Sequence, residues 1–136
     1  MHPQKALHSQ KASLTVEAGK VAEFVRATGG TEWDDSAVPP TFPAVLEHHS
    51  PPIVDLVLSL GYPAERLLHG EEVIDYPNGP LRVGDVLTGE TRFVGSETKH
   101  GRAGTLEFLT TTTDLHRPDG ELAVRITRTL ILVPPS

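Results

Sequence analysis

The sequence predicts an α+β domain in which an antiparallel sheet wraps around one buried helix. Two patterns support this prediction. Residues 39–61 form the longest apolar stretch of the chain, and their apolar positions follow helical spacing. The last third, residues 85–133, alternates apolar and polar side chains as strands do, and turn sequences divide it. A helix followed by strands that are joined by short turns is typical of two packed layers.

The N-terminal part is less regular than the rest. Residues 1–13 are polar, so we expect a flexible N-terminus followed by a single domain over residues 14–136. Residues 13–16 favour a short strand. A first helix is expected at residues 17–28, with Thr15 as its cap and the following glycines as its end.

The segment 39–61 is predicted to be the buried central helix. Thr41 is suited to cap it, and Gly61 is suited to end it. Pro51 and Pro52 should kink or split it, because proline lacks the backbone donor that a helix needs. The segment is apolar on nearly every face, which is typical of a fully buried helix. Asp55 lies within it and would need a partner if buried.

The strands after this helix are separated by recognisable turns. Residues 67–76 favour a strand with an irregularity at His69-Gly70, and Asp119-Gly120 favours a tight hairpin turn. We therefore predict an antiparallel meander of strands at residues 85–97, 105–115 and 122–133, with a loop at residues 99–104.

Composition excludes several functional classes. The chain of 136 residues has 12 Lys and Arg against 18 Asp and Glu, a net charge of −6, so nucleic-acid binding is not expected. The cysteine count of 0 excludes disulfides, thiolate metal sites and cysteine nucleophiles. No apolar run is long enough to span a membrane and no signal peptide is visible, so we expect a cytoplasmic protein without membrane contact.

A few polar residues are candidates for a site. Trp33 with Asp34 and Asp35 could mark a substrate mouth or simply cap the core. His69 precedes a glycine that permits close backbone approach, so His69 could line a ligand site or make a structural hydrogen bond. The adjacent His48 and His49 do not face one another on a helix, and no metal site is predicted there.

Residues 99–102 (KHGR) form a small cationic loop in an acidic chain. This loop could attract a phosphate group or be an ordinary solvated hairpin tip.

Several short motifs resemble the N-terminal MaoC-like (FAS1-type) dehydratase family, which has the hot-dog fold. Residues 39–46 (PPTFPAVL) resemble the start of its central helix, and residues 68–71 (LHGE) resemble its next strand. Residues 80–87 (PLRVGDVL) resemble its proline and Gly-Asp turn, and residues 119–121 (DGE) resemble its last hairpin. The similarities run from about residue 16 to residue 133, nearly the whole chain.

This resemblance implies hydration of 2-enoyl thioesters, or dehydration of (R)-3-hydroxyacyl thioesters, on coenzyme A or acyl carrier protein. It implies an Asp and a His five positions later as the acid–base pair. No Asp in this chain has a His at that spacing, since Pro39 and Pro40 stand there after Asp34 and Asp35. The chain therefore resembles the non-catalytic unit of paired hot-dog proteins.

Three hypotheses follow. The first is an accessory subunit that forms a homodimer or heterodimer with a second hot-dog chain, because a lone sheet would leave an edge strand open. The second is a self-sufficient hydratase or thioesterase that uses His69 with Asp34 or Asp35. The third is a non-catalytic acyl-thioester binding module. No bound cofactor or metal is expected; the residues expected to contact substrate are Trp33, Thr41, Phe42, His69, Gly70 and Glu71.

Overall fold

One antiparallel sheet organises the fold. The computed structural model describes residues 9–30, 33, 37–46, 52–102 and 104–135. Five strands pair in the order β1-β3-β4-β5-β2, all antiparallel. Their bounds are β1 (Ser9–Thr15), β2 (Leu67–Asp75), β3 (Val86–Gly101), β4 (Gly104–His116) and β5 (Leu122–Leu132).

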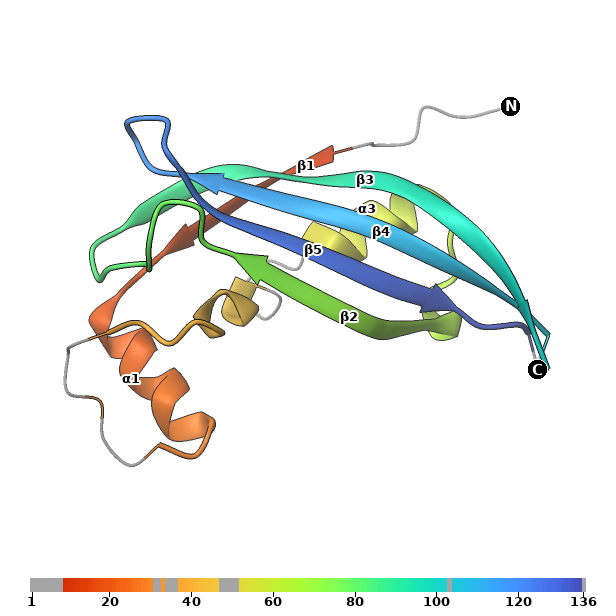
Figure 1. Ribbon diagram of the computed structural model, residues 1–136, viewed down its shortest axis with the longest axis horizontal. Helices are drawn as coiled ribbons and strands as arrows, with labels where there is room; N and C mark the ends of the chain where they lie inside the picture. Colours follow the sequence, from red (N-terminus) through yellow and green to blue (C-terminus); the bar gives the residue numbers. More distant parts are fainter. Residues whose placement is uncertain (1–8, 31–32, 34–36, 47–51, 103, 136) are drawn as a thin grey trace.

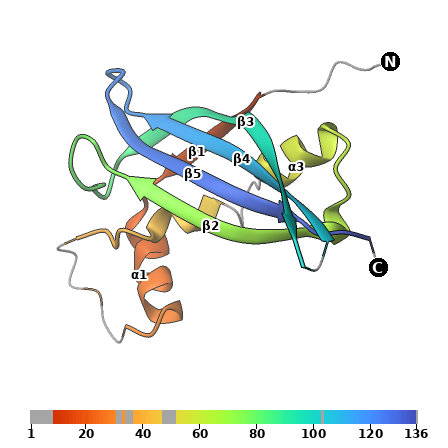
Figure 2. The same cartoon turned by 45° about the vertical axis from the view of Figure 1, so that its right-hand side comes forward.

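The sheet arches over helix α3 (Pro52–Ser59), while α1 (Ala18–Ala27) lies at one end of the molecule (Figure 1). Turning the molecule shows β2 as the edge strand on one side and β1 on the other (Figure 2). We call the side of the sheet that faces α3 the inner face, and the opposite side the outer face. The predicted α+β architecture, a hot-dog arrangement of sheet and helix, is confirmed.

β1 begins at Ser9 rather than at the expected Ser13, so part of the segment predicted to be flexible is a strand. Its backbone pairs with β3 from Ser9 opposite Arg92 to Thr15 opposite Val86. Ala12 and Leu14 turn inward and are buried, while Lys11, Ser13 and Thr15, which alternate with them, are exposed. The first part of this strand was not predicted, because its outward side chains are polar and do not resemble a strand in composition.

Helix α1 lies where the sequence predicts it, but its cap differs. Glu17 occupies the N-cap position and makes no side-chain cap hydrogen bond, so the prediction of Thr15 as cap is wrong. Val21 is fully buried, and Phe24 and Val25 are half-buried on the same face. The helix ends before Gly29, whose φ of 100° suits glycine.

The described parts of the central segment are helical, and Pro51, where a break was predicted, lies outside the described residues. A 3-10 helix, η1 (Phe42–Val45), comes first, and α3 follows from Pro52. The expectation that every face is buried is wrong: Asp55 and Ser59 are exposed, and Leu58 keeps 47% of its surface exposed. Asp55 therefore needs no buried partner. Among the described residues, no helix combines the length and hydropathy that crossing a membrane requires.

The strand predictions hold, with two refinements. The irregularity in β2 is a register shift between His69 and Glu71, as expected. β3 and β4 continue pairing to Gly101 opposite Gly104, so most of the predicted loop at residues 99–104 belongs to a long hairpin. Among the described residues, β1 accompanies β3 only as far as Arg92, and the hairpin extends beyond it.

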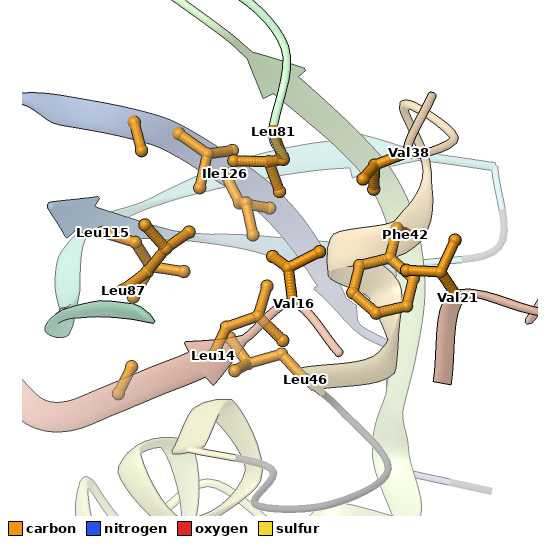
Figure 3. Close-up of a cluster of buried hydrophobic side chains, with 13 residues drawn as sticks. Leu14, Val16, Val21, Val38, Phe42, Leu46, Leu81, Leu87, Leu115 and Ile126 are labelled. Atoms are coloured by element: carbon orange, nitrogen blue, oxygen red, sulfur yellow. The ribbon is translucent and has the colours of Figure 1, made fainter. Parts of the chain in front are cut away.

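Two apolar clusters fill the inner face. The large cluster joins the sheet to α1 and η1, and Phe42 lies at one side of it beside Val21 and Val38 (Figure 3). The small cluster joins α3 to the sheet and consists of Ile53, Val57, Leu109 and Leu130, with Tyr62, Leu67 and Phe93 packed against it. The large cluster comprises Ala12, Leu14, Val16, Val21, Val38, Phe42, Leu46, Leu81, Leu87, Leu115, Ala123, Val124 and Ile126.

Two turns that resemble family motifs are joined by an ion pair. Arg117, which precedes the Asp119-Gly120 turn, donates from Nη2 to Asp85 Oδ2 over 3.1 Å and from Nη1 to Glu121 Oε1 over 2.7 Å. The backbone N–H of Arg82 also donates to Asp85, over 2.9 Å. Burial alone would raise the pKa of Asp85, but the hydrogen bonds and charge of Arg117 and the Arg82 amide lower it.

We expect Asp85→Asn to lower the free energy of unfolding at pH 7 by about 1–3 kcal/mol, because a half-buried charged hydrogen-bonding group is lost. The lowered pKa means that Asp85 stabilises the fold above its unfolded pKa of about 4, and that this contribution disappears as pH falls through the folded pKa. Urea unfolding across this pH range should therefore show a shallower acid dependence in the variant. Asp55→Asn, the same change at an exposed site, is the control.

Two glycines of β3 offer a matched test of packing. A Cβ on Gly89 would overlap the backbone carbonyl oxygen of Asp114, whereas a Cβ on Gly95 meets nothing within 4 Å. We expect Gly89→Ala to lose about 3 kcal/mol or more, because the backbone of β4 cannot move without losing its pairing. Gly95→Ala should be neutral or stabilising by up to about 1 kcal/mol. Equal effects in denaturant unfolding would contradict the described β3–β4 spacing.

Candidate acyl-binding site

An apolar pocket of about 250 Å³ opens between α3 and the edge strand β2. We call it the α3–β2 pocket. Two residues at its rim, Leu58 and Leu68, keep 47% and 55% of their surface exposed. Large exposed apolar side chains beside a concave apolar surface are typical of a binding site. The pocket is lined by Ile53, Val57, Leu58, Ala64, Leu67, Leu68, His69 and Leu130.

Among the described residues of this lining, His69 is the one with a polar side chain. It is exposed and lies on β2 beside the register shift. The next residue is Gly70, whose backbone lies close to β5. A Cβ at this position would be 3.0 Å from the carbonyl oxygen of Thr129, so glycine fits there. The irregular strand thus leaves His69 at the pocket mouth.

Gly70 and Glu71 line a different hollow, on the outer face, of about 580 Å³. Lys99 lies in the same outer-face groove, with its Nζ 4.8 Å from the ring centroid of Phe108. The structure therefore separates His69 from Gly70 and Glu71, which the sequence placed in one substrate-binding motif. Substrate binding by His69, Gly70 and Glu71 is therefore a proposal.

Trp33 lines a third pocket, of about 440 Å³, with residues 80–83 and Val38. Its indole N–H donates to the carbonyl oxygen of Ala37 over 2.7 Å, and its ring packs against the large cluster. Asp34 and Asp35 lie outside the described residues, as do His48 and His49. The described lining residues of this pocket and of the α3–β2 pocket do not overlap.

Thr41 and Phe42 lie at the start of η1. Thr41 is exposed and makes no side-chain cap hydrogen bond, so its predicted capping role is wrong. Phe42 is fully buried and meets Phe24 edge to face at 5.6 Å between ring centroids. Nearby, the Tyr76 hydroxyl donates to the carbonyl oxygen of Pro40, and burial raises the pKa of Tyr76 to about 12. The start of η1 is thus held by the packing of Phe42 and by the hydrogen bond from the Tyr76 hydroxyl, which is protonated at neutral pH.

A row of buried polar side chains crosses the inner face between the two apolar clusters. Arg128, with 0% of its side chain exposed, donates from Nε to Glu72 Oε1 over 3.1 Å and from Nη1 to Thr113 Oγ1 over 2.8 Å. Thr113 Oγ1 lies 2.6 Å from Thr91 Oγ1. We call Glu72, Arg128, Thr111, Thr113 and Thr91 the polar row; it spans β2, β5, β4 and β3.

Thr111 completes the row without a hydrogen bond of its own. It is fully buried and pairs across the sheet with Arg128, but its Oγ1 has no hydrogen-bond partner among the described residues. This row was not predicted from the sequence. The alternation of β5 could have revealed it, because Ile126 and Leu130 face inward and Arg128, midway between them, must face the same side of the sheet.

We expect Glu72→Met to lower the free energy of unfolding by about 3–5 kcal/mol, because it leaves the charge of Arg128 buried without its carboxylate. Glu72→Met combined with Arg128→Met should lose less than the sum of the two single changes. Glu71→Met, next in the chain but exposed, should change stability by less than about 0.5 kcal/mol. Chemical unfolding of the four variants gives the coupling, and strict additivity would contradict the pairing.

The described part of the chain holds no cluster of His, Asp or Glu that could bind a metal ion. The sequence holds no Asp followed by a His at the spacing that the resemblance implies. The observed arrangement can therefore bind an apolar group between α3 and β2, with a histidine at its mouth. An acid–base pair is not assembled by the described residues.

Comparisons with solved structures agree with this architecture. The HadBC (3R-hydroxyacyl-ACP dehydratase) complex of Mycobacterium tuberculosis matches with a TM-score of 0.70 at 16% identity, over 93% of this chain and 98% of that one. A MaoC-like dehydratase matches with a TM-score of 0.73 at 20% identity, over 94% of this chain but 42% of that one. At these identities the likeness shows the fold.

The ChsH1-ChsH2 complex of Mycobacterium tuberculosis matches with a TM-score of 0.64 at 15% identity, over 94% of this chain and 84% of that one. No curated protein matches the sequence. The family described as FAS1-like, dehydratase domain region, matches residues 4–126, which is most of the chain. The chain therefore belongs to the FAS1-like dehydratase domain family and has the hot-dog fold of MaoC-like dehydratases.

Proposed function

We propose that this chain is the accessory subunit of an (R)-specific enoyl-thioester hydratase or 3-hydroxyacyl-thioester dehydratase. It holds the acyl part of a substrate carried on coenzyme A or acyl carrier protein. A second hot-dog chain supplies the Asp and His. The observation that carries this proposal is the apolar α3–β2 pocket, found in a family member whose sequence lacks the acid–base pair.

The position of the pocket supports pairing with a second chain. β2 is an edge strand, so one row of its backbone N–H and C=O groups faces outward from the sheet. Leu68 and Val73, with 55% and 41% of their surface exposed, lie on this strand. A partner that added its own edge strand to β2 would cover these side chains and close the mouth of the pocket.

Two solved neighbours suggest the form of such a partnership. HadBC and ChsH1-ChsH2 are each named as a complex of two differently named chains. A heterodimer, in which this chain contributes the pocket and its partner the acid and base, fits the missing pair better than a homodimer. In a homodimer of this chain, neither subunit would supply the Asp and His pair.

A self-sufficient enzyme is the second candidate, and the exposed His69 at the pocket mouth is the observation that favours it. In that case His69 would move the proton, with Asp34 or Asp35 as a possible second group. A pure binding module is the third. The three candidates differ in turnover and in binding, so one set of measurements separates them.

We expect the chain purified alone to bind butyryl-CoA but not to hydrate crotonyl-CoA, with its mass in solution measured on the same sample. Ala64→Phe fills the α3–β2 pocket and should weaken butyryl-CoA binding at least about tenfold, a loss of about 1.4 kcal/mol. Ala27→Phe makes the same change at an exposed position on α1 and is the control.

Turnover that His69→Ala abolishes would overturn the accessory role and support the self-sufficient enzyme. Binding without turnover, followed by turnover once a hot-dog chain carrying the Asp and His is added, supports the proposal. Binding that no such partner converts to turnover favours the binding module.

A further inference from the structure

The α3–β2 pocket lies beside the polar row along β5, and the described lining of the pocket stops at Leu130. Leu130 forms part of the pocket lining, and Arg128 is the next inward residue on the same strand, about 6.5–7 Å away. On β4, Leu109 and Thr111 stand in the same relation, opposite Leu130 and Arg128. The apolar lining thus gives way within one step to a row of buried hydrogen-bonding groups.

Thr111 is the member of this row that points to a ligand. Its hydroxyl is fully buried and unpartnered among the described residues, which destabilises the fold. A valine of the same shape would avoid this loss. A ligand oxygen that reached the hydroxyl would remove the penalty and add a hydrogen bond in a site shielded from water.

The charge of the row selects the kind of oxygen. Arg128 is balanced by Glu72 over 3.1 Å, so the row has no excess positive charge for a carboxylate or phosphate. A neutral hydroxyl or ketone oxygen needs no counter-charge. An unmodified alkyl chain would gain nothing there, because it would cover polar groups without pairing them.

We propose that the polar row recognises a neutral oxygen on the acyl part of the thioester, remote from the thioester carbon, with Thr111 as the contacting group. This inference rests on the proposed function, since it assumes that the acyl chain occupies the α3–β2 pocket. Contact between the ligand and Thr111 requires the Leu130 side chain, which is 9% exposed and lies between the pocket and the row, to rotate aside on binding. The substrate class is therefore an oxygenated acyl thioester rather than a plain fatty acyl thioester.

The test compares octanoyl-CoA with a series of hydroxyoctanoyl-CoA isomers that carry the hydroxyl at successive carbons toward the chain end. Calorimetric Kd values are measured for the wild type, Thr111→Val and Thr112→Val. Thr112 is the neighbour on the same strand that faces the opposite side and is 7% exposed, so it is a matched control. Thr111→Val removes an unpartnered hydroxyl without changing shape, and the variant should fold at least as stably as the wild type.

The expected result is that one isomer binds the wild type about three- to tenfold more tightly than octanoyl-CoA, the effect of one hydrogen bond. Thr111→Val should abolish that preference, and Thr112→Val should keep it. Binding of all the thioesters with no preference, or a preference that survives Thr111→Val, would overturn this inference and leave the proposed function intact. If no thioester binds at all, both fail.

Discussion

The hydrogen bonds that run from Glu72 through Arg128 and Thr113 to Thr91 hold four strands in one register on the face that α3 covers. A shift of one residue in any of these strands would turn its inward side chains to the outer face. Such a shift of β2 would leave Arg128 buried without the carboxylate of Glu72, a far larger loss than misplacing one leucine. The apolar clusters on either side provide most of the burial, while the polar row fixes which residues meet. The rest of the fold depends on this alignment.

Most of the architecture could be predicted from local sequence, because the relevant signals are local. Alternation and the Asp119-Gly120 turn identified β4 and β5, and the apolar helical spacing identified α3. The exposure of Asp55 was not predicted, because an apolar run does not reveal which face of a short helix the sheet leaves open. The length of β3 was also underestimated, since Lys99 and His100 are polar residues of a strand whose pairing partner decides its extent.

The candidate site was harder to predict than the fold. The motif around residues 68–71 drew attention to His69, Gly70 and Glu71 together, but the register shift in β2 sends them to different hollows. The Gly-Asp turn is similarly structural: Asp85 binds Arg117 and links two turns rather than contacting a pocket. A site built from Leu130, Ile53 and β2 brings together residues far apart in the chain, and their proximity appears only once the strand order is known.

Because the described part of β1 pairs with only part of β3, two parts of β3 differ in how firmly the sheet holds them. Up to Arg92, β3 has hydrogen-bonded neighbours on both sides; beyond it, among the described residues, only β4 pairs with it. Of the described part of this hairpin, only residues 99–101 with residues 104–106 form a two-stranded ribbon, and such ribbons twist more readily than the interior of a sheet. From Phe93 to Thr98, β4 still pairs with β5, and β3 is an edge strand of the sheet. The amides on its outward side exchange with solvent without any opening of the fold, whereas those between Val86 and Arg92 exchange only when the sheet itself separates.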